Sequence, residues 1–184
     1  MTSGQASGVV AVLLLFGAVL GTIIGGIATD RLRDRVPGAP MLIAGVSQVA
    51  GSFFLVIVFL DVPLAVRIVT ALLGAMFVVA GFPALTAMTA EVVPAAIRGL
   101  TFSVTTFLSA LVSAGSPLLI GAIADQFKFV TPSGAVKGNL ANAFLIVTPL
   151  VFVGGLVVLR GRRHVEADRI RAAELARVIA AEHA

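Results

Sequence analysis

Long apolar stretches alternate with short polar segments along most of this chain. The sequence contains five such stretches, at residues 8–29, 38–60, 64–90, 100–124 and 139–159. Each supplies the ~20 residues that an α-helix needs to cross a hydrocarbon core of ~30 Å. A helix of a soluble domain keeps a polar face toward water, and these stretches have none. The pattern therefore predicts an all-α polytopic membrane protein, with five transmembrane helices within a domain of residues 1–159.

The last segment, residues 160–184, has a different pattern. Its apolar residues recur at helical spacing, and oppositely charged residues stand three positions apart. These pairs are Glu166/Arg169, Asp168/Arg171 and Glu174/Arg177. We expect an amphipathic helix that lies against the membrane surface and touches anionic lipid. A helix that docks a partner protein is the alternative.

The distribution of basic residues predicts how the chain is oriented. Only 12% of the residues are charged, which is about half the share in a soluble domain. Lys and Arg accumulate in the cytoplasmic loops of membrane proteins. Three basic residues, Arg67, Lys128 and Lys137, fall on one side of the predicted membrane. The others fall on the opposite side: Arg31, Arg33, Arg35, Arg98, Arg160, Arg162, Arg163, Arg169, Arg171 and Arg177. We therefore predict a multi-pass protein of the cell (inner or plasma) membrane, with its N-terminus outside and its C-terminus in the cytoplasm.

Several classes of function are disfavoured by what the sequence lacks. It has no cysteine, and its two histidines, His164 and His183, both lie in the tail. The apolar stretches carry no ionisable residue near their centres, where proton relays and charged-substrate sites are usually found. The basic residues lie in loops and in the tail and form no binding face for nucleic acid. We expect no enzymatic activity, cofactor, metal site or nucleic-acid partner.

Two series of small or polar residues stand out within the apolar stretches. Gly17, Gly21 and Gly25 recur every four residues in the first stretch, so they share a helix face and allow a neighbouring helix to approach closely. The contact is either static packing or a surface on which helices slide.

The fifth stretch is apolar on every side and is expected to face lipid.

Hydroxyl groups form a stripe in the fourth stretch. Thr106, Ser109, Ser113 and Ser116 recur at intervals of three or four residues and therefore share a face. They either line a water-filled cavity for a substrate or hydrogen-bond to carbonyl groups of their own helix.

The polar loops at the basic side contain two motifs. The first has the form G-x-x-x-D-R-x-x-x-R and comprises Gly26, Asp30, Arg31 and Arg35. The second has the form E-x-x-P-x-x-x-R-G and comprises Glu91, Pro94, Arg98 and Gly99. They resemble two loop motifs of the major facilitator superfamily of secondary transporters. Residues 116–125 are similar to the eleventh helix of its spinster-like and related branches. Arg33 and Asp34 depart from the first motif, because the family usually has Gly at the position of Arg33.

The resemblance implies the architecture of a secondary transporter. Members of the family have twelve helices in two six-helix halves, and the five stretches match the last five helices. The chain is thus expected to be a fragment of a C-terminal half-bundle, with the lipid bilayer, a small-molecule substrate and the missing N-terminal half as partners. The first, third and fourth stretches would line the cavity, and the second and fifth would be peripheral. The weakly polar lining suggests a neutral, amphipathic substrate.

The resemblance also implies roles for the motif residues in a cytoplasmic gate. Arg31 and Arg35 would pair with Glu91, and Arg98 would join this network. Asp30 would face the N-terminus of a helix in the other half, where the helix dipole favours a carboxylate. Alternatively, these charges only set the topology, which is the interpretation we prefer for Arg33.

A function other than transport is also compatible with the missing helices. A truncated or accessory membrane protein would use the same apolar helices as a scaffold that packs against other membrane proteins. The sequence specifies neither the substrate nor a coupling ion.

Overall fold

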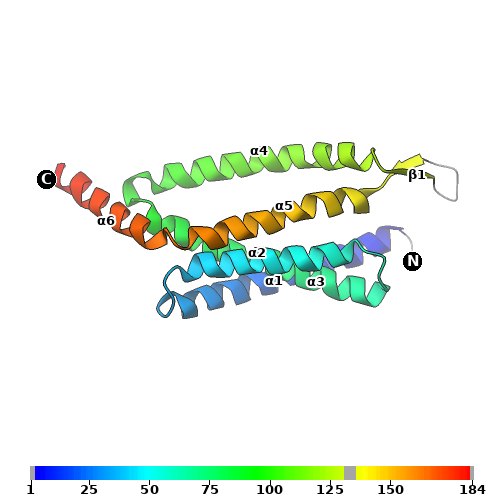
Figure 1. Cartoon of the computed structure of the whole chain (residues 1–184), viewed down its shortest axis with the longest axis horizontal. Helices are drawn as coiled ribbons and strands as arrows, with labels where there is room; N and C mark the ends of the chain where they lie inside the picture. Colours follow the sequence, from blue (N-terminus) through cyan, green and yellow to red (C-terminus); the bar gives the residue numbers. More distant parts are fainter. Residues whose placement is uncertain (1–2, 131–135, 183–184) are drawn as a thin grey trace.

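The computed structural model describes residues 3–130 and 136–182 of the chain (Figure 1). Within them, six α-helices follow one another: α1 (Ser3–Arg33), α2 (Ala39–Val58), α3 (Leu64–Val92), α4 (Arg98–Ala124), α5 (Leu140–Gly161) and α6 (Val165–Glu182). A short 3₁₀ helix, η1 (Ala95–Ile97), precedes α4, and an antiparallel hairpin of β1 (Lys128–Val130) and β2 (Val136–Gly138) joins α4 to α5.

The helices α1 to α5 correspond to the five apolar stretches. Across the described residues, five helices are long and apolar enough to span a membrane. The chain is therefore an all-α polytopic membrane protein, as the sequence predicts. Local chemistry explains where α3 ends and where α2 begins. Val93, which precedes Pro94, is extended, because proline disfavours the helical conformation of the residue before it. Gly38 has a φ of 68° before α2, and glycine adopts this left-handed conformation without steric cost.

Four helices form the packed part of the molecule. Helix α3 packs against α1 on one side and α2 on the other, and α2 also packs against α5 (Figure 1). Glycines allow close approach at these helix contacts, as expected where lipid rather than water surrounds the bundle. A Cβ atom added to Gly45 of α2 would lie 2.9 Å from the carbonyl oxygen of Gly155 in α5.

The glycine series of α1 forms its contact with α3, which confirms the predicted close approach. A Cβ added to Gly17 would lie 2.9 Å from the carbonyl oxygen of Leu72, and Gly21 and Gly25 meet the backbone of Met76 and Ala80 in the same way. Each contact advances four residues along both helices. Helices α1 and α3 therefore run in the same direction and end at the same side of the bundle.

Helix α5 is not lipid-facing on every side, which corrects the expectation from its composition. It buries Ala143, Thr148 and Gly155, and a Cβ at Gly155 would lie 2.9 Å from Cγ2 of Val49 in α2. A hydrophobic sequence does not distinguish a face that meets lipid from one that packs on another apolar helix.

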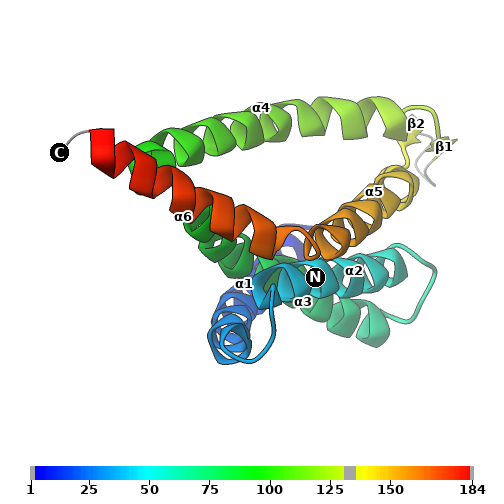
Figure 2. The ribbon, with the colours of Figure 1, turned by 60° about the vertical axis from the view of Figure 1, so that its left-hand side comes forward.

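Helix α4 lies apart from the packed helices. Its main helix contact is with α5, and Figures 1 and 2 both show it separated from α1, α2 and α3. All residues from 103 to 119 are exposed, including Leu111 (62%) and Leu118 (79%). This helix therefore presents an apolar circumference that no other described helix of this chain covers.

The loops divide between two ends of the bundle (Figure 1). One end holds the α1–α2 loop, the α3–η1–α4 connection and the start of α6, and we call it the arginine-rich end. The α2–α3 loop and the β1–β2 hairpin lie at the other end.

Candidate functional site

Glu91 is the charged residue around which the arginine-rich end is organised. It lies in the last turn of α3, and only 11% of its side chain is exposed. A carboxylate so poorly hydrated requires partners that compensate for the lost water. The segment that follows is held in place by Pro94, which has a φ of −53° and begins η1.

Two arginines from distant segments contact this carboxylate. Arg33, the last residue of α1, forms an ion pair with Oε1 through its Nη2. Arg169, from α6, donates a hydrogen bond from its Nη2 to Oε2. Oε1 is buried but receives no hydrogen bond from the described residues, so the contact with Arg33 is electrostatic without hydrogen-bond alignment. The carboxylate therefore joins the ends of α1, α3 and α6.

The sequence predicts that Arg31 and Arg35 pair with Glu91. The structure shows other partners, so this prediction was wrong. Both side chains are exposed, and within the described part of the chain neither forms an ion pair. The reason is helix register. Arg33 follows Thr29, which is 3% exposed, and both continue the four-residue series of glycines that packs on α3. Arg33 therefore points toward the end of α3, whereas Arg31 points away.

Sequence reasoning assigned Arg33 to topology alone and did not connect Arg169 to the site. The sequence did contain a pattern that points to Arg33, because the four-residue spacing of Gly17, Gly21 and Gly25 continues through Thr29 to Arg33. No sequence signal identified Arg169, which lies 78 residues from Glu91. The predicted pairs within the tail helix are confirmed for Glu166/Arg169 at 3.9 Å and Asp168/Arg171 at 3.8 Å. The side chain of Arg177 lies outside the described residues.

The remaining motif residues lie near this site without joining the Glu91 cluster. Arg98 donates a 3.4 Å hydrogen bond from Nη2 to the carbonyl of Val93, and its Nε is buried without a partner among the described residues. Asp30 is exposed. A Cβ atom added to Gly26 or Gly99 would meet no atom within 4 Å, so neither glycine is required by close packing within this chain.

The tail has a second attachment to the arginine-rich end. Arg162 donates a 3.0 Å hydrogen bond from its Nε to the carbonyl of Pro37 in the α1–α2 loop. Its side chain lies over Gly38, where an added Cβ would be 2.7 Å from Cγ of Arg162. Val165, at the start of α6, is 3% exposed. The tail therefore crosses the ends of the packed helices before α6 leaves the bundle (Figure 2).

The hydroxyl stripe of α4 lies on a helix that the rest of the chain leaves uncovered. Thr106, Ser109, Ser113 and Ser116 are all exposed. Ser116 donates a 2.9 Å hydrogen bond to the carbonyl of Ser113, which is the packing alternative for that residue. The stripe encloses no cavity with another described helix.

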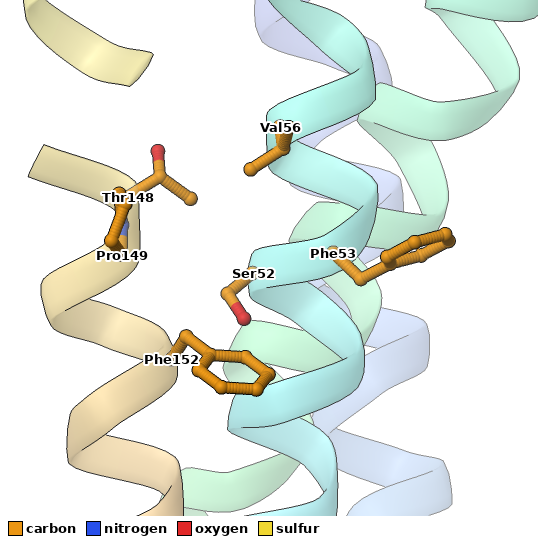
Figure 3. Close-up of a pocket in the computed structure, with 6 residues that line it drawn as sticks. All are labelled: Ser52, Phe53, Val56, Thr148, Pro149 and Phe152. Atoms are coloured by element: carbon orange, nitrogen blue, oxygen red, sulfur yellow. The ribbon is translucent and has the colours of Figure 1, made fainter. Parts of the chain in front are cut away.

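A separate cavity of about 300 Å³ lies between α2 and α5. Figure 3 shows Val56, Thr148 and Phe152 around it, while the ring of Phe53 points away from α5. The hydroxyls of Ser52 and Thr148 donate to carbonyls of their own helices, at 2.8 Å and 2.7 Å, so the surface of the cavity is apolar. In the described residues, no group of three or more His, Asp or Glu side chains could hold a metal ion.

Comparison with known proteins finds a membrane-protein relative of this chain. No family model matches it. The sequence is 30% identical over 172 residues to a zebrafish (Danio rerio) protein named spinster homolog 3. The matched region covers 88% of this chain and 34% of that protein, so the chain spans about a third of the length of its relative. The match agrees with the five membrane-spanning helices and with the loop motifs, which resemble those of the major facilitator superfamily.

Proposed function

We propose that this chain forms part of one half of a secondary transporter that moves a small solute by alternating access. The other half would be supplied by helices outside the chain, in line with the 34% of the relative's length that the match covers. In this proposal the arginine-rich end is cytoplasmic, as the excess of arginine there favours. The chemistry is transport rather than catalysis.

The Glu91 cluster is the observation that carries the proposal. Alternating access requires contacts that close one end of the pathway in one state and separate in the other. Glu91 connects α1 and α3 at one end of the bundle through Arg33, and 44% of that arginine side chain is exposed. A half-exposed ion pair of this kind is weak enough to open. We assign Asp30, Arg31, Arg35 and Arg98 to the same gate.

The hydroxyl groups of α4 also support the proposal, because they could line the pathway of the solute. It carries the hydroxyl stripe Thr106, Ser109, Ser113 and Ser116 on a surface that the described chain leaves free. Hydroxyls that face a pathway between two halves would hydrogen-bond a neutral or amphipathic solute without the cost of burying a charge. The apolar cavity between α2 and α5, by contrast, offers such a solute no hydrogen bond.

Cysteine labelling tests whether the stripe faces water. The chain contains no cysteine, so single-cysteine variants need no further engineering. Ser113→Cys and Val112→Cys place a thiol at the same depth on different faces of α4. In native membranes of cells that make the protein, a charged methanethiosulfonate reagent should modify Ser113→Cys at least about tenfold faster, because only a hydrated thiol forms the reactive thiolate.

Equal rates at the two positions would contradict a water-filled pathway along α4. That result would favour the alternative function, a scaffold that packs against other membrane proteins, because both thiols would then be in lipid or in a helix contact. Gly115→Cys lies three residues after Val112, on the same side of the helix, and repeats the comparison with Ser113→Cys at a second depth.

A further inference from the structure

We propose that α6 is a latch on the gate, and that Arg169 is a positioning residue that holds the arginine-rich end closed through Glu91. Arg169 belongs to neither loop motif, and the chain separates it from Glu91 by 78 residues. The proposal rests on the gate described above, because a latch has consequences only where an end opens.

The geometry makes Arg169 the better aligned of the two partners of Glu91. Its Nη2 donates a hydrogen bond to Oε2, whereas Arg33 pairs with Oε1, which receives no hydrogen bond from the described part of the chain. Hydrogen bonds between charged groups are about twice as strong as those between neutral groups. The orientation of the Glu91 carboxylate, and through it the contact with Arg33, therefore depends on α6.

A second attachment fixes where α6 begins. Arg162 binds the carbonyl of Pro37 and packs over Gly38, and Val165 is buried at the first turn. These contacts anchor the tail to the α1–α2 loop. Arg169 lies one turn farther along α6, on the same side as Val165. The start of α6 is thus attached to the bundle, and its contact with α3 lies one helical turn after this attachment.

Two apolar side chains of α6 beyond Arg169 are largely exposed. Ile170 is 54% exposed and Leu175 is 50% exposed, and the main helix contact of α6 is with the end of α3. Arg169 is itself 34% exposed. Ala172 and Leu175 line a shallow groove with Val92 and Pro94, so loss of the ion pair would leave only this partly exposed apolar contact between the described part of α6 and the end of α3.

Distances between spin labels test the latch without a known substrate. The full chain is reconstituted in liposomes of phosphatidylcholine, with labels on cysteines at Ala96 in η1 and Ala173 in α6, both exposed positions. We expect one narrow distance distribution. Arg169→Gln and Glu91→Gln should each broaden it at least about twofold, since either removes the only contact of charged groups that joins α6 to α3 in the described residues.

A matched control comes from the same helix. Arg171→Gln removes the same charge, but Arg171 is 80% exposed and, among the described residues, forms its ion pair with Asp168 of its own helix rather than with α3. It should leave the distribution narrow. Arg169→Lys retains the charge and should restore part of the narrow distribution.

A second pair of labels separates a latch from a merely structural tail. Labels at Asp34 and Ala96 report the spacing between the end of α1 and η1, and neither is on α6. Arg169→Gln should add a population at longer distance, whereas Arg171→Gln should not. The proposal is overturned if Arg169→Gln and Arg171→Gln give the same α6 distances. It is equally overturned if α6 is released and the Asp34–Ala96 distance is unchanged. Both readouts are independent of thiol labelling on α4, so failure of the latch and failure of the pathway are distinguishable.

Discussion

At the residue scale, Glu91 is the carboxylate that joins α3 to two other helices in the described part of the chain. Its side chain is 11% exposed and contacts arginines from two other helices. Removal of this carboxylate takes from Arg33 and Arg169 the acceptor that joins them to α3, and Arg169 keeps only the 3.9 Å contact with Glu166 of its own helix among the described residues.

We therefore expect Glu91→Ala to impair transport in the complete transporter while membrane insertion is retained. The initial rate of uptake should fall by about tenfold or more, which corresponds to ~1.4 kcal/mol. Uptake and the amount of protein in the membrane fraction are measured together. Asp168→Ala, which removes an exposed carboxylate paired only with Arg171, serves as the control. A wild-type rate for Glu91→Ala would reduce the motif to a topology signal.

The glycines of α1 allow a prediction about stability. A Cβ atom at Gly21 would collide with the backbone of Met76, so Gly21→Ala must push α1 away from α3. Overpacking of this kind costs about 1–3 kcal/mol. Gly154→Ala adds the same methyl group to α5, where no atom lies within 4 Å. In detergent, heating should remove the monodisperse peak of Gly21→Ala in size-exclusion chromatography at a lower temperature than that of Gly154→Ala. Identical profiles would show that the glycine contact does not limit stability.

At the scale of elements, α3 and α4 differ in how much of their surface other helices cover. Helix α3 contacts α1 and α2 along its length, whereas residues 103–119 of α4 are all exposed. Few packing contacts mean a low free energy of local opening.

Hydrogen exchange should reveal this difference. In detergent micelles, peptides from residues 103–119 should exchange their amide hydrogens at least about tenfold faster than peptides from residues 70–88. The measurement is hydrogen–deuterium exchange with mass spectrometry on the purified chain, and α2, packed on both α3 and α5, provides a second protected reference. Comparable protection of α4 and α3 would indicate that α4 is covered, for example by a second copy of the chain.

At the scale of the whole molecule, a pathway requires walls on all sides. The described helices leave the hydroxyl stripe of α4 facing outward, so they do not surround that stripe on all sides. We expect that the purified chain in liposomes shows no saturable uptake of radiolabelled neutral solutes, from glucose to monooleoylglycerol. Protein-free liposomes provide the baseline. Saturable uptake above that baseline would contradict the proposal that a second half is needed.

Much of the fold is predictable from the sequence because the membrane acts on each segment separately. A helix that crosses the bilayer must satisfy its backbone internally and be apolar over ~20 residues, and this property can be read without knowledge of neighbouring helices. The glycine series of α1 was also predictive, since four-residue spacing defines a single helix face. The same spacing, followed to Arg33, would have identified one partner of Glu91.

The sequence alone thus determined the class of protein, its five spans and the close contact made by Gly17, Gly21 and Gly25. The tertiary structure decided which arginines reach Glu91, Arg33 and Arg169 rather than Arg31 and Arg35. It also decided that α5 packs on α2 and that α4 lies apart. The reason is physical. Hydrophobicity and spacing are properties of one helix, whereas an ion pair between helices depends on the register and direction of both.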